Sequence, residues 1–289
     1  NIGVKVDLSE GSATSVSGGA TDKVQNISNL IGSAYDDTLI GNDRDNVIIG
    51  GQGNDRLEGR GGYNTYIFEE DWGIDQVINS SGQGMLDLSA LGADWHLIID
   101  LTAKIITVNS SLPEIANNGI DFDGISHIRS GAGNDEFIIS NRQKMDLEGG
   151  NGEDTFKFVG IGILEGIIDG GTGDNTLDYS GYATAVTFNL ATMNATGLNG
   201  FTNIHKLIGS DSNGDGDTIR GANADSRYEI TAENAGKITW NITLGGQEVE
   251  YYFEFEGIEN LIGGTGKDTF AIIGQGSLTG SIDGGAGSN

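Results

Sequence analysis

The sequence predicts an all-β solenoid, a right-handed parallel β-helix or β-roll with short insertions. Three observations predict it. Short apolar runs alternate with Gly, Asn and Asp turns, Gly accounts for 49 of the 289 residues while Pro occurs once, and related segments recur along the chain. Glycines at regular positions indicate tight turns, not a loose linker. We therefore expect residues 1–289 to form a single repetitive solenoid, a fragment of a longer protein.

Two short patterns recur from the N-terminal end onward. The first, VKVDLS from Val4, returns as LIIDLT and VTFNLA. Its apolar side chains alternate with the two-residue period of a strand. The second, VQNISNLIG from Val24, returns as FDGISHIRS, FTNIHKLIG and FEGIENLIG, and each copy runs into a Gly/Asp loop. The chain is therefore an array of related units.

Residues 32–67 hold four consecutive nonapeptides: GSAYDDTLI, GNDRDNVII, GGQGNDRLE and GRGGYNTYI. Each approximates G-G-x-G-x-D-x-U-x, where U is a large apolar residue. Gly allows the positive φ of a tight loop, and x-U-x forms a short strand with U inside. The Asp at position six supplies a carboxylate, and calcium accepts about six to eight oxygen ligands. The alternative is a Gly/Asp turn without a metal, capped by its own backbone amides.

Further loops of this kind stand singly. Residues 147–175 align with 261–289 without a gap, with 17 of 29 positions identical. The position-six residues of the single loops are Asp135, Asp154, Asn175, Asp217, Asp268 and Asn289. Several of the intervals between these residues are about 20 residues or about twice that. We therefore expect each coil to carry one loop, and all of these loops to lie at a single corner of the solenoid. Residues 69–125 and 222–255 have fewer Gly loops and are expected to be inserted segments.

The loop from Gly209, GSDSNGDGDTIRG, has oxygen-bearing side chains at alternate positions: Asp211, Asn213, Asp215 and Asp217. It resembles the first half of an EF-hand loop, but Ala222 stands where the bidentate Glu belongs. The simpler alternative is a nonapeptide-like loop with a two-residue insertion. Asp225 is a further candidate ligand.

The nonapeptides resemble the hemolysin-type (RTX) calcium-binding repeats of secreted bacterial toxins, proteases and giant adhesins. That resemblance implies a parallel β-roll with calcium held between a loop and the loop one coil later, two nonapeptides along. On this pattern Asp37 and Asp55 share an ion. Asn46 and Asn64 face each other on the opposite side, where Asn departs from the family, and Asp43 and Asp45 are candidates to compensate. The predicted metal ligands are Asp37, Asp43, Asn46, Asp55, Asn64, Asp135, Asp154, Asp211, Asn213, Asp215, Asp217 and Asp268.

Composition narrows the partners. The net charge is −27, from 42 acidic and 15 basic residues. Such a surface repels nucleic acids and anionic membranes, whereas crowded carboxylates attract hard cations; the simpler alternative is that the acids only keep the chain soluble. The absence of Cys excludes disulfides and thiolate metal sites, and no apolar run reaches the ~20 residues of a membrane helix. Expected partners are calcium, a cell-surface protein or glycan, and other copies meeting end to end.

No catalytic constellation is visible. The sequence contains neither H-E-x-x-H nor G-x-S-x-G, and His127 and His205 fall in the recurring box, where exposed strand positions are expected. Trp72, Trp95 and Trp240 are expected to pack in the core or in the insertions rather than to form a sugar-binding face. We therefore expect no enzymatic activity in this segment.

The favoured function is a calcium-stabilised structural or adhesive segment of a large bacterial surface or secreted protein that attaches to cells or matrix. One alternative is the RTX secretion and folding module of a toxin or hydrolase whose catalytic domain lies outside this chain. Another is a glycan-active β-helix enzyme with paired carboxylates. The degenerate long repeats favour the first of these functions, the structural or adhesive segment. The resemblance also implies a type I-like secretion route, with the chain unfolded at cytosolic calcium and folded by extracellular calcium.

Overall fold

The computed structural model describes residues 2–109, 117–211, 216–287 and 289. These residues form strands and turns without a helix. The chain separates into two compact units. Unit 1 comprises residues 1–137 and 144–152, and unit 2 comprises 138–143 and 153–289, with β15 (Glu136–Ile139) divided between them. Each unit is an all-β solenoid built mainly from parallel strands, as the sequence predicts.

Unit 1 contains two sheets. Sheet 1A has the strand order β3–β2–β1–β5–β7–β9–β13–β12–β11. Its strands are β1 (Val4–Asp7), β2 (Ser12–Ser15), β3 (Asp22–Lys23), β5 (Thr38–Ile40), β7 (Arg56–Glu58), β9 (Ile74–Ile78), β11 (Leu97–Asp100), β12 (Ile105–Val108) and β13 (Gly119–Asp123). The run from β1 through β5, β7 and β9 to β13 is parallel, and the strands at both ends are antiparallel.

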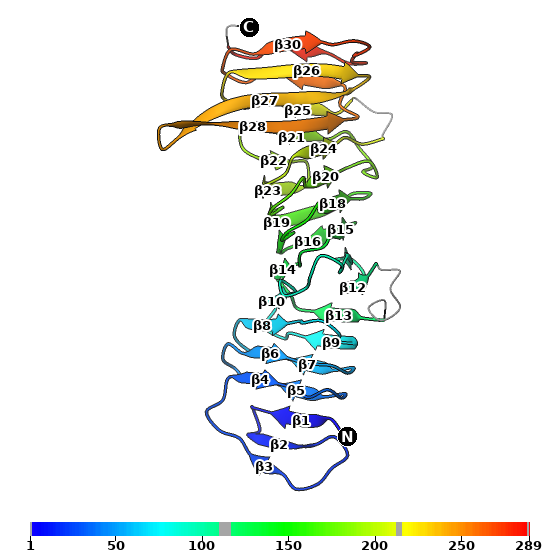
Figure 1. The fold of residues 1–289 in the computed structure, drawn as a ribbon, viewed down its shortest axis with the longest axis vertical. Coiled ribbons are helices and arrows are strands. Elements are labelled where there is room, and N and C mark those ends of the chain that lie inside the picture. The colour runs from blue at the N-terminus through cyan, green and yellow to red at the C-terminus, as the bar shows by residue number, and fades with distance from the viewer. Residues whose placement is uncertain (1, 110–116, 212–215, 288) are drawn as a thin grey trace. The chain divides into compact units, whose positions relative to one another are not determined.

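Sheet 1B is parallel throughout, in the order β4–β6–β8–β10–β14–β17. Its strands are β4 (Asn29–Ile31), β6 (Val47–Ile49), β8 (Asn64–Ile67), β10 (Gly84–Asp87), β14 (His127–Arg129) and β17 (Asp146–Glu148). The chain visits sheets 1B and 1A alternately, and Figure 1 shows β5, β7 and β9 side by side, as are β4, β6 and β8. Thr38 lies opposite Arg56, so one coil of the tandem run is two nonapeptides long, as predicted.

The apolar residue of each nonapeptide stacks on its equivalent one coil away. In sheet 1A, Leu39, Leu57 and Val77 lie opposite one another, and each is at most 1% exposed. In sheet 1B the same stack runs through Ile48 and Tyr66, both fully buried. Burial of one large apolar side chain per loop contributes roughly 1.5–3 kcal/mol, which fixes the strand register.

Unit 2 also contains two sheets, with longer segments between some of their strands. Sheet 2A has the order β18–β20–β24–β28–β27–β26–β30, with β18 (Thr155–Phe158), β20 (Thr176–Asp178), β24 (Lys206–Ile208), β26 (Ser226–Ala232), β27 (Ala235–Leu244), β28 (Gln247–Glu256) and β30 (Thr269–Ile272). Sheet 2B has the order β16–β19–β23–β22–β21–β25–β29–β31, with β16 (Arg142–Gln143), β19 (Ile163–Asp169), β21 (Thr187–Asn189), β22 (Asn194–Ala195), β23 (Leu198–Thr202), β25 (Thr218–Arg220), β29 (Asn260–Ile262) and β31 (Ile282–Asp283).

The segments expected to be insertions contain antiparallel strands. In 69–125 the coil continues through β9 and β10, and then β11, β12 and β13 form a meander. In 222–255 the long strands β27 and β28 form a hairpin beside β26. Trp72, Trp95 and Trp240 are all buried, so the core prediction for them is confirmed. No described helix is long and apolar enough to cross a membrane.

Candidate metal centre

The loops of the tandem run lie so close together that their glycines cannot carry a side chain. Gly51 and Gly53, at positions two and four of their nonapeptide, have φ of 99° and 120°. A Cβ on Gly51 would lie 2.2 Å from the carbonyl oxygen of Ser33, in the loop one coil earlier. The Gly pairs at 150/152 and 171/173 also have positive φ. The G-x-G spacing therefore lets the backbone of one loop rest on that of the next.

Three buried carboxylates, which we call the acid ladder, follow one another along sheet 1A: Asp37, Asp55 and Asp75. Each is 2% exposed. The backbone N–H of Asp37 donates to Asp55 Oδ1 (2.8 Å), and that of Asp55 donates to Asp75 Oδ1 (2.8 Å). The structure thus brings Asp37 and Asp55 together, one coil apart.

The second oxygen of each later carboxylate lacks a donor. Among the described residues, Oδ2 of Asp55 and Oδ2 of Asp75 are buried without a hydrogen-bond partner. Burial, followed by the neighbouring acids, raises the pKa of Asp55 to about 6 and that of Asp75 to about 8. A buried carboxylate of this kind costs free energy unless a proton or a cation compensates its charge.

A hard divalent cation fits these oxygens. Calcium prefers carboxylate and carbonyl oxygens in a flexible shell, and the carbonyl oxygens of Ser33 and Gly50 lie within these loops. Asp55 Oδ2 lies close against Gly50, because a Cβ there would be 2.2 Å away. No group of three or more His, Asp or Glu side chains converges within the described part of the chain. Carbonyls or water would therefore have to complete any coordination shell.

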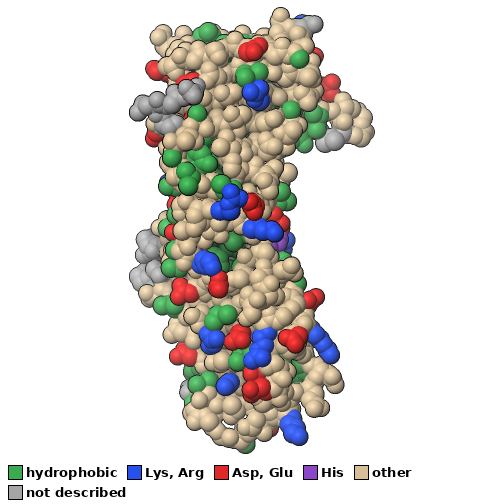
Figure 2. All heavy atoms as spheres, turned by 180° about the vertical axis from the view of Figure 1, so that it is seen from behind, with side chains coloured by type: hydrophobic (Ala, Val, Ile, Leu, Met, Phe, Trp, Pro, Cys, Tyr) green, Lys and Arg blue, Asp and Glu red, His purple; other side chains and the backbone are tan. Residues whose placement is uncertain are grey.

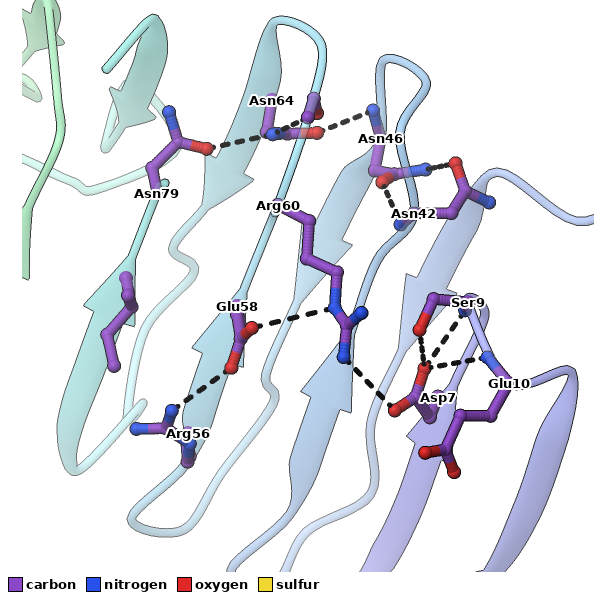
Figure 3. Close-up of polar contacts among 12 residues, drawn as sticks. Asp7, Ser9, Glu10, Asn42, Asn46, Arg56, Glu58, Arg60, Asn64 and Asn79 are labelled. Atoms are coloured by element: carbon purple, nitrogen blue, oxygen red, sulfur yellow. Dashed lines mark hydrogen bonds and ion pairs between the residues drawn. The ribbon is translucent and has the colours of Figure 1, made fainter. Parts of the chain in front are cut away.

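Asn46 and Asn64 stand at the equivalent loop position on the side of sheet 1B, and together with Asn79, which follows β9, they form a buried set that we call the amide ladder (Figure 3). The N–H of Asn46 donates to Asn64 Oδ1 (2.9 Å), and Asn64 Nδ2 donates to Asn79 Oδ1 (2.8 Å). Asn46 Nδ2 donates to the carbonyl of Ser28 (2.9 Å). These amides satisfy one another while uncharged, so this side has no need of a cation.

Asp43 and Asp45, the acids expected to compensate for the amides on that side, are exposed rather than buried beside them. Asp43 is exposed and lines a groove with Glu58 and Arg60. Asp45 is also exposed and accepts the backbone N–H of Tyr63 (2.7 Å). Neither carboxylate is placed among the buried amides.

A separate set of charges lies near the N-terminal strand of sheet 1A (Figure 3). Arg60 contacts Asp7 and Glu58 at 3.5 Å each, and Arg56 contacts Glu58 at 3.0 Å. Burial opposes ionisation of Asp7, but hydrogen bonds from Ser9 and Glu10 and the Arg60 charge lower its pKa overall. Asp7 is thus already compensated and differs from the acid ladder. Figure 2 likewise shows basic side chains gathered among acidic ones on one face.

The single loops divide between sheets. In unit 1, Asp135 Oδ1 accepts the N–H of Leu97 (2.7 Å), and burial raises the Asp135 pKa to about 6. In unit 2, Asp154 donates its N–H to Asn175 Oδ1 (2.8 Å), and Asp268 donates its N–H to Asn289 Oδ1 (2.7 Å). Asp154, Asn175 and Asp268 each precede a strand of sheet 2A, and Asn289 stacks upon Asp268. These four residues of unit 2 therefore lie at one corner, as predicted.

Asp217 does not follow them, and the prediction of a single corner is wrong for it. It precedes β25 of sheet 2B, where Val186 donates its N–H to Asp217 Oδ1 (2.6 Å). The coil after Asn175 reaches His205 instead, because strands β21 to β23 lengthen that coil. Burial raises the pKa of Asp217. Asp211 is exposed, while Asn213 and Asp215 lie outside the described residues, so the EF-hand-like half-loop has no described geometry.

Two acids that stand at position six of a loop, Asp75 and Glu259, were not among the predicted metal ligands. Asp75 lies in Gly73–Val77, GIDQV, which retains the second half of the nonapeptide, G-x-D-x-U. Glu259 accepts the N–H of Asp217 through Oε2 (2.6 Å) and stands where the next coil would place an Asp. The recurring box is a degenerate nonapeptide whose fifth residue is position six: Ser28, Ser126, His205 and Glu259. Aligning the box on the strand after it would have found Glu259.

The histidines are less exposed than expected. His127 on β14 and His205 before β24 are both half-buried, and His127 Nε2 lies 2.9 Å from Glu148 Oε1. His96 Nδ1 accepts the N–H of Asn134 (2.8 Å). His205 packs against Tyr252, with ring centroids 5.2 Å apart, so each histidine has a structural contact.

Comparison with known proteins agrees with the loop geometry. Residues 31–66 match the family described as RTX calcium-binding nonapeptide repeat (4 copies). No curated protein matches the chain significantly. The match covers the acid-ladder residues Asp37 and Asp55 and the amide-ladder residues Asn46 and Asn64. Residues 31–66 are therefore an array of RTX calcium-binding nonapeptide repeats.

Proposed function

We propose that this chain is a calcium-stabilised structural segment of a secreted or cell-surface protein, with a role in attachment to cells or matrix. The observation that carries the proposal is the acid ladder. Asp55 and Asp75 each hold a carboxylate oxygen inside the loops, buried and without a hydrogen-bond donor among the described residues. A cation bound there would remove the cost of that buried charge and couple binding to folding.

Calcium is the cation that the donor set favours. The chain has no Cys, and the ladder positions offer carboxylate and carbonyl oxygens. Zinc and other transition metals prefer nitrogen and sulfur ligands, and magnesium demands a tight octahedral shell. In unit 1 the candidate ligands are Asp37, Asp55, Asp75 and Asp135. In unit 2 they are Asp154, Asp217 and Asp268.

A structural role is favoured over catalysis because the acids are already used by the fold. The loop carboxylates accept backbone N–H groups of neighbouring coils, and the histidines hold structural contacts. RTX repeat proteins are typically secreted. Extracellular calcium would therefore be available to the loops after export. Repetitive solenoids suit spacer or attachment elements, since stacked coils present an extended surface.

Calorimetric titration of the metal-free chain, followed in parallel by circular dichroism, tests this function. We expect several calcium ions to bind and the β structure to increase as they do. Magnesium at the same concentration should produce only a small part of this increase in β structure. A β-rich chain that binds no calcium would overturn the proposal, because the loops would then be bare turns.

A further inference from the structure

The hairpin of β27 and β28 extends past the strands on either side of it (Figure 1). β26 pairs with β27 only as far as Trp240, and β24 pairs with β28 only at Glu254–Glu256. Within the described residues, no strand lies beyond Asn241–Leu244 on the outer side of β27. Gly245 and Gly246 close the hairpin with φ of 59° and 85°, as in a type I′ turn. The outer half is thus a two-stranded ribbon with an open edge.

A groove of about 560 Å³ lies along this open edge. Its wall on the coil side includes Arg227 and Lys267, and its wall on the hairpin side includes Asn241, Glu248 and Glu250. Arg227 Nε is held by Glu229 Oε1 at 2.7 Å. Neither Glu248 nor Glu250 forms an ion pair with another described residue. The hairpin side of the groove therefore carries uncompensated negative charge.

The backbone in the groove continues an established pairing. Ser226, the first residue of β26, lies opposite Trp240, and the edge of β27 runs on from there through Asn241 to Leu244. In an antiparallel sheet, alternate residues direct their N–H and C=O groups to each side. Alternate residues of Asn241–Leu244 therefore point these groups into the position that a strand in line with β26 would occupy.

We propose that this groove binds an extended peptide of a partner protein, which adds to β27 at Asn241–Leu244 as a further strand. The peptide carries basic side chains at alternate positions. Asn241 lies opposite Glu250 and Thr243 opposite Glu248, so both carboxylates lie on the face above the added strand. A second copy of this chain is a poor occupant, because each copy has a net charge of −27.

This inference names a partner class for the attachment role and rests on that part of the proposed function. It does not rest on calcium, since none of Asn241–Leu244, Glu248 and Glu250 is a predicted calcium ligand. The two proposals can therefore fail separately.

The test uses the full chain in calcium and a short, end-capped, fluorescent peptide in which lysine alternates with threonine. We expect saturable binding by fluorescence anisotropy and slower hydrogen exchange at Asn241–Leu244. A peptide of the same sequence with every backbone amide methylated keeps its charge but cannot pair, so its binding should be lost. Glu248→Gln with Glu250→Gln should weaken binding about three- to tenfold. Glu69→Gln with Glu70→Gln, the same charge change at exposed acids of unit 1, should leave it unchanged.

Equal binding of the methylated peptide, or unchanged exchange at Asn241–Leu244, would overturn the inference and indicate nonspecific attraction. Protection of that segment by self-association alone, seen by sedimentation, would assign the edge to a second copy instead. Circular dichroism of the same samples reports calcium-dependent folding. A chain that folds with calcium yet ignores the peptide would remove only this inference.

Discussion

Aspartate and asparagine occupy the same loop position on the two sheets of unit 1, and the charge of the side chain decides what each position needs. Asp55 Oδ1 accepts the N–H of Asp37, just as Asn64 Oδ1 accepts the N–H of Asn46. The second polar atom of the side chain differs between the two residues. Asn64 Nδ2 donates to the carbonyl of Gly61 (2.9 Å), whereas Asp55 Oδ2 has no donor among the described residues. The amide ladder is an internal control for the acid ladder.

Replacing the acids by amides should therefore make calcium unnecessary at this site. For Asp55→Asn with Asp75→Asn, we expect the free energy of unfolding of the metal-free chain to rise by about 1–3 kcal/mol, since an unsatisfied buried oxygen becomes a donor. The stabilisation gained on adding calcium should fall. Urea unfolding in chelator and in calcium measures both effects. Glu69→Gln with Glu70→Gln, the same charge change at exposed acids of unit 1, is the control. A less stable variant in chelator would contradict this account.

The acid ladder also sets a pH dependence for the metal-free chain. Folding raises the pKa of Asp55 to about 6 and of Asp75 to about 8, chiefly through burial, whereas the unfolded chain keeps values near about 4. The folded chain then binds more protons at these two groups, so their contribution to stability is greatest below about pH 4 and falls as the pH rises to about 8. Ion pairs such as Arg129–Glu148 act oppositely, because they lower the pKa of Glu148, and their contribution is lost in acid.

Thermal unfolding in chelator between about pH 5 and about pH 8 tests this slope. We expect the melting temperature to fall with rising pH, and to fall less in the Asp55→Asn, Asp75→Asn variant. Calcium-loaded chain should show the reverse, since protons compete with the ion. A metal-free melting temperature that rises with pH would show that the ladder carboxylates have other partners.

Sequence reasoning succeeded for residues of nonapeptides that follow one another without a gap. Asp37 and Asp55 were placed together because the repeat length fixes one coil. Asp75 was missed because its loop has lost the Gly-Gly start, and Glu259 because a Glu stands in the Asp position. Both still stand two residues before a buried apolar residue that stacks in the core, Val77 and Leu261.

At the scale of loops and strands, close stacking makes glycine necessary at positions two and four of the third nonapeptide, Gly51 and Gly53. Gly53→Ala would place a Cβ 2.6 Å from the carbonyl carbon of Tyr35 at a φ of 120°. We expect a loss of about 2 kcal/mol or more in the free energy of unfolding in saturating calcium. Gln52→Ala, at the exposed position before it, should change stability by less than about 0.5 kcal/mol. Denaturant midpoints compare them, and equal losses would argue against tight loop stacking.

The sequence predicted elements best where the coil length is constant. The tandem strands follow from the repeat, whereas Asp217 was assigned to the wrong corner because intervals alone do not say which sheet a loop enters. The hairpin of β27 and β28 was expected only as an irregular insertion. Its strands pair with each other over Gly236–Leu244 and Gln247–Phe255, so no nonapeptide pattern records them.

At the scale of the whole molecule, the net charge of −27 opposes folding, and each unit buries loop carboxylates of its own. In unit 1 these are Asp37, Asp55, Asp75 and Asp135, and in unit 2 Asp154, Asp217 and Asp268. Several like charges are thus brought into low-dielectric surroundings when the coils close. Calcium at the loops would lower that cost in both units, which couples folding to the ion.

Amide hydrogen exchange of the full chain, in calcium and in chelator, tests this coupling most directly. The amides of Arg56 and Gln76 are the reporters, because they donate to the carbonyls of Asp37 (2.9 Å) and Asp55 (2.8 Å) between consecutive coils. We predict strong protection of both amides in calcium and much weaker protection in chelator. Equal protection in the two conditions would contradict the account, because the coils would then close without the ion.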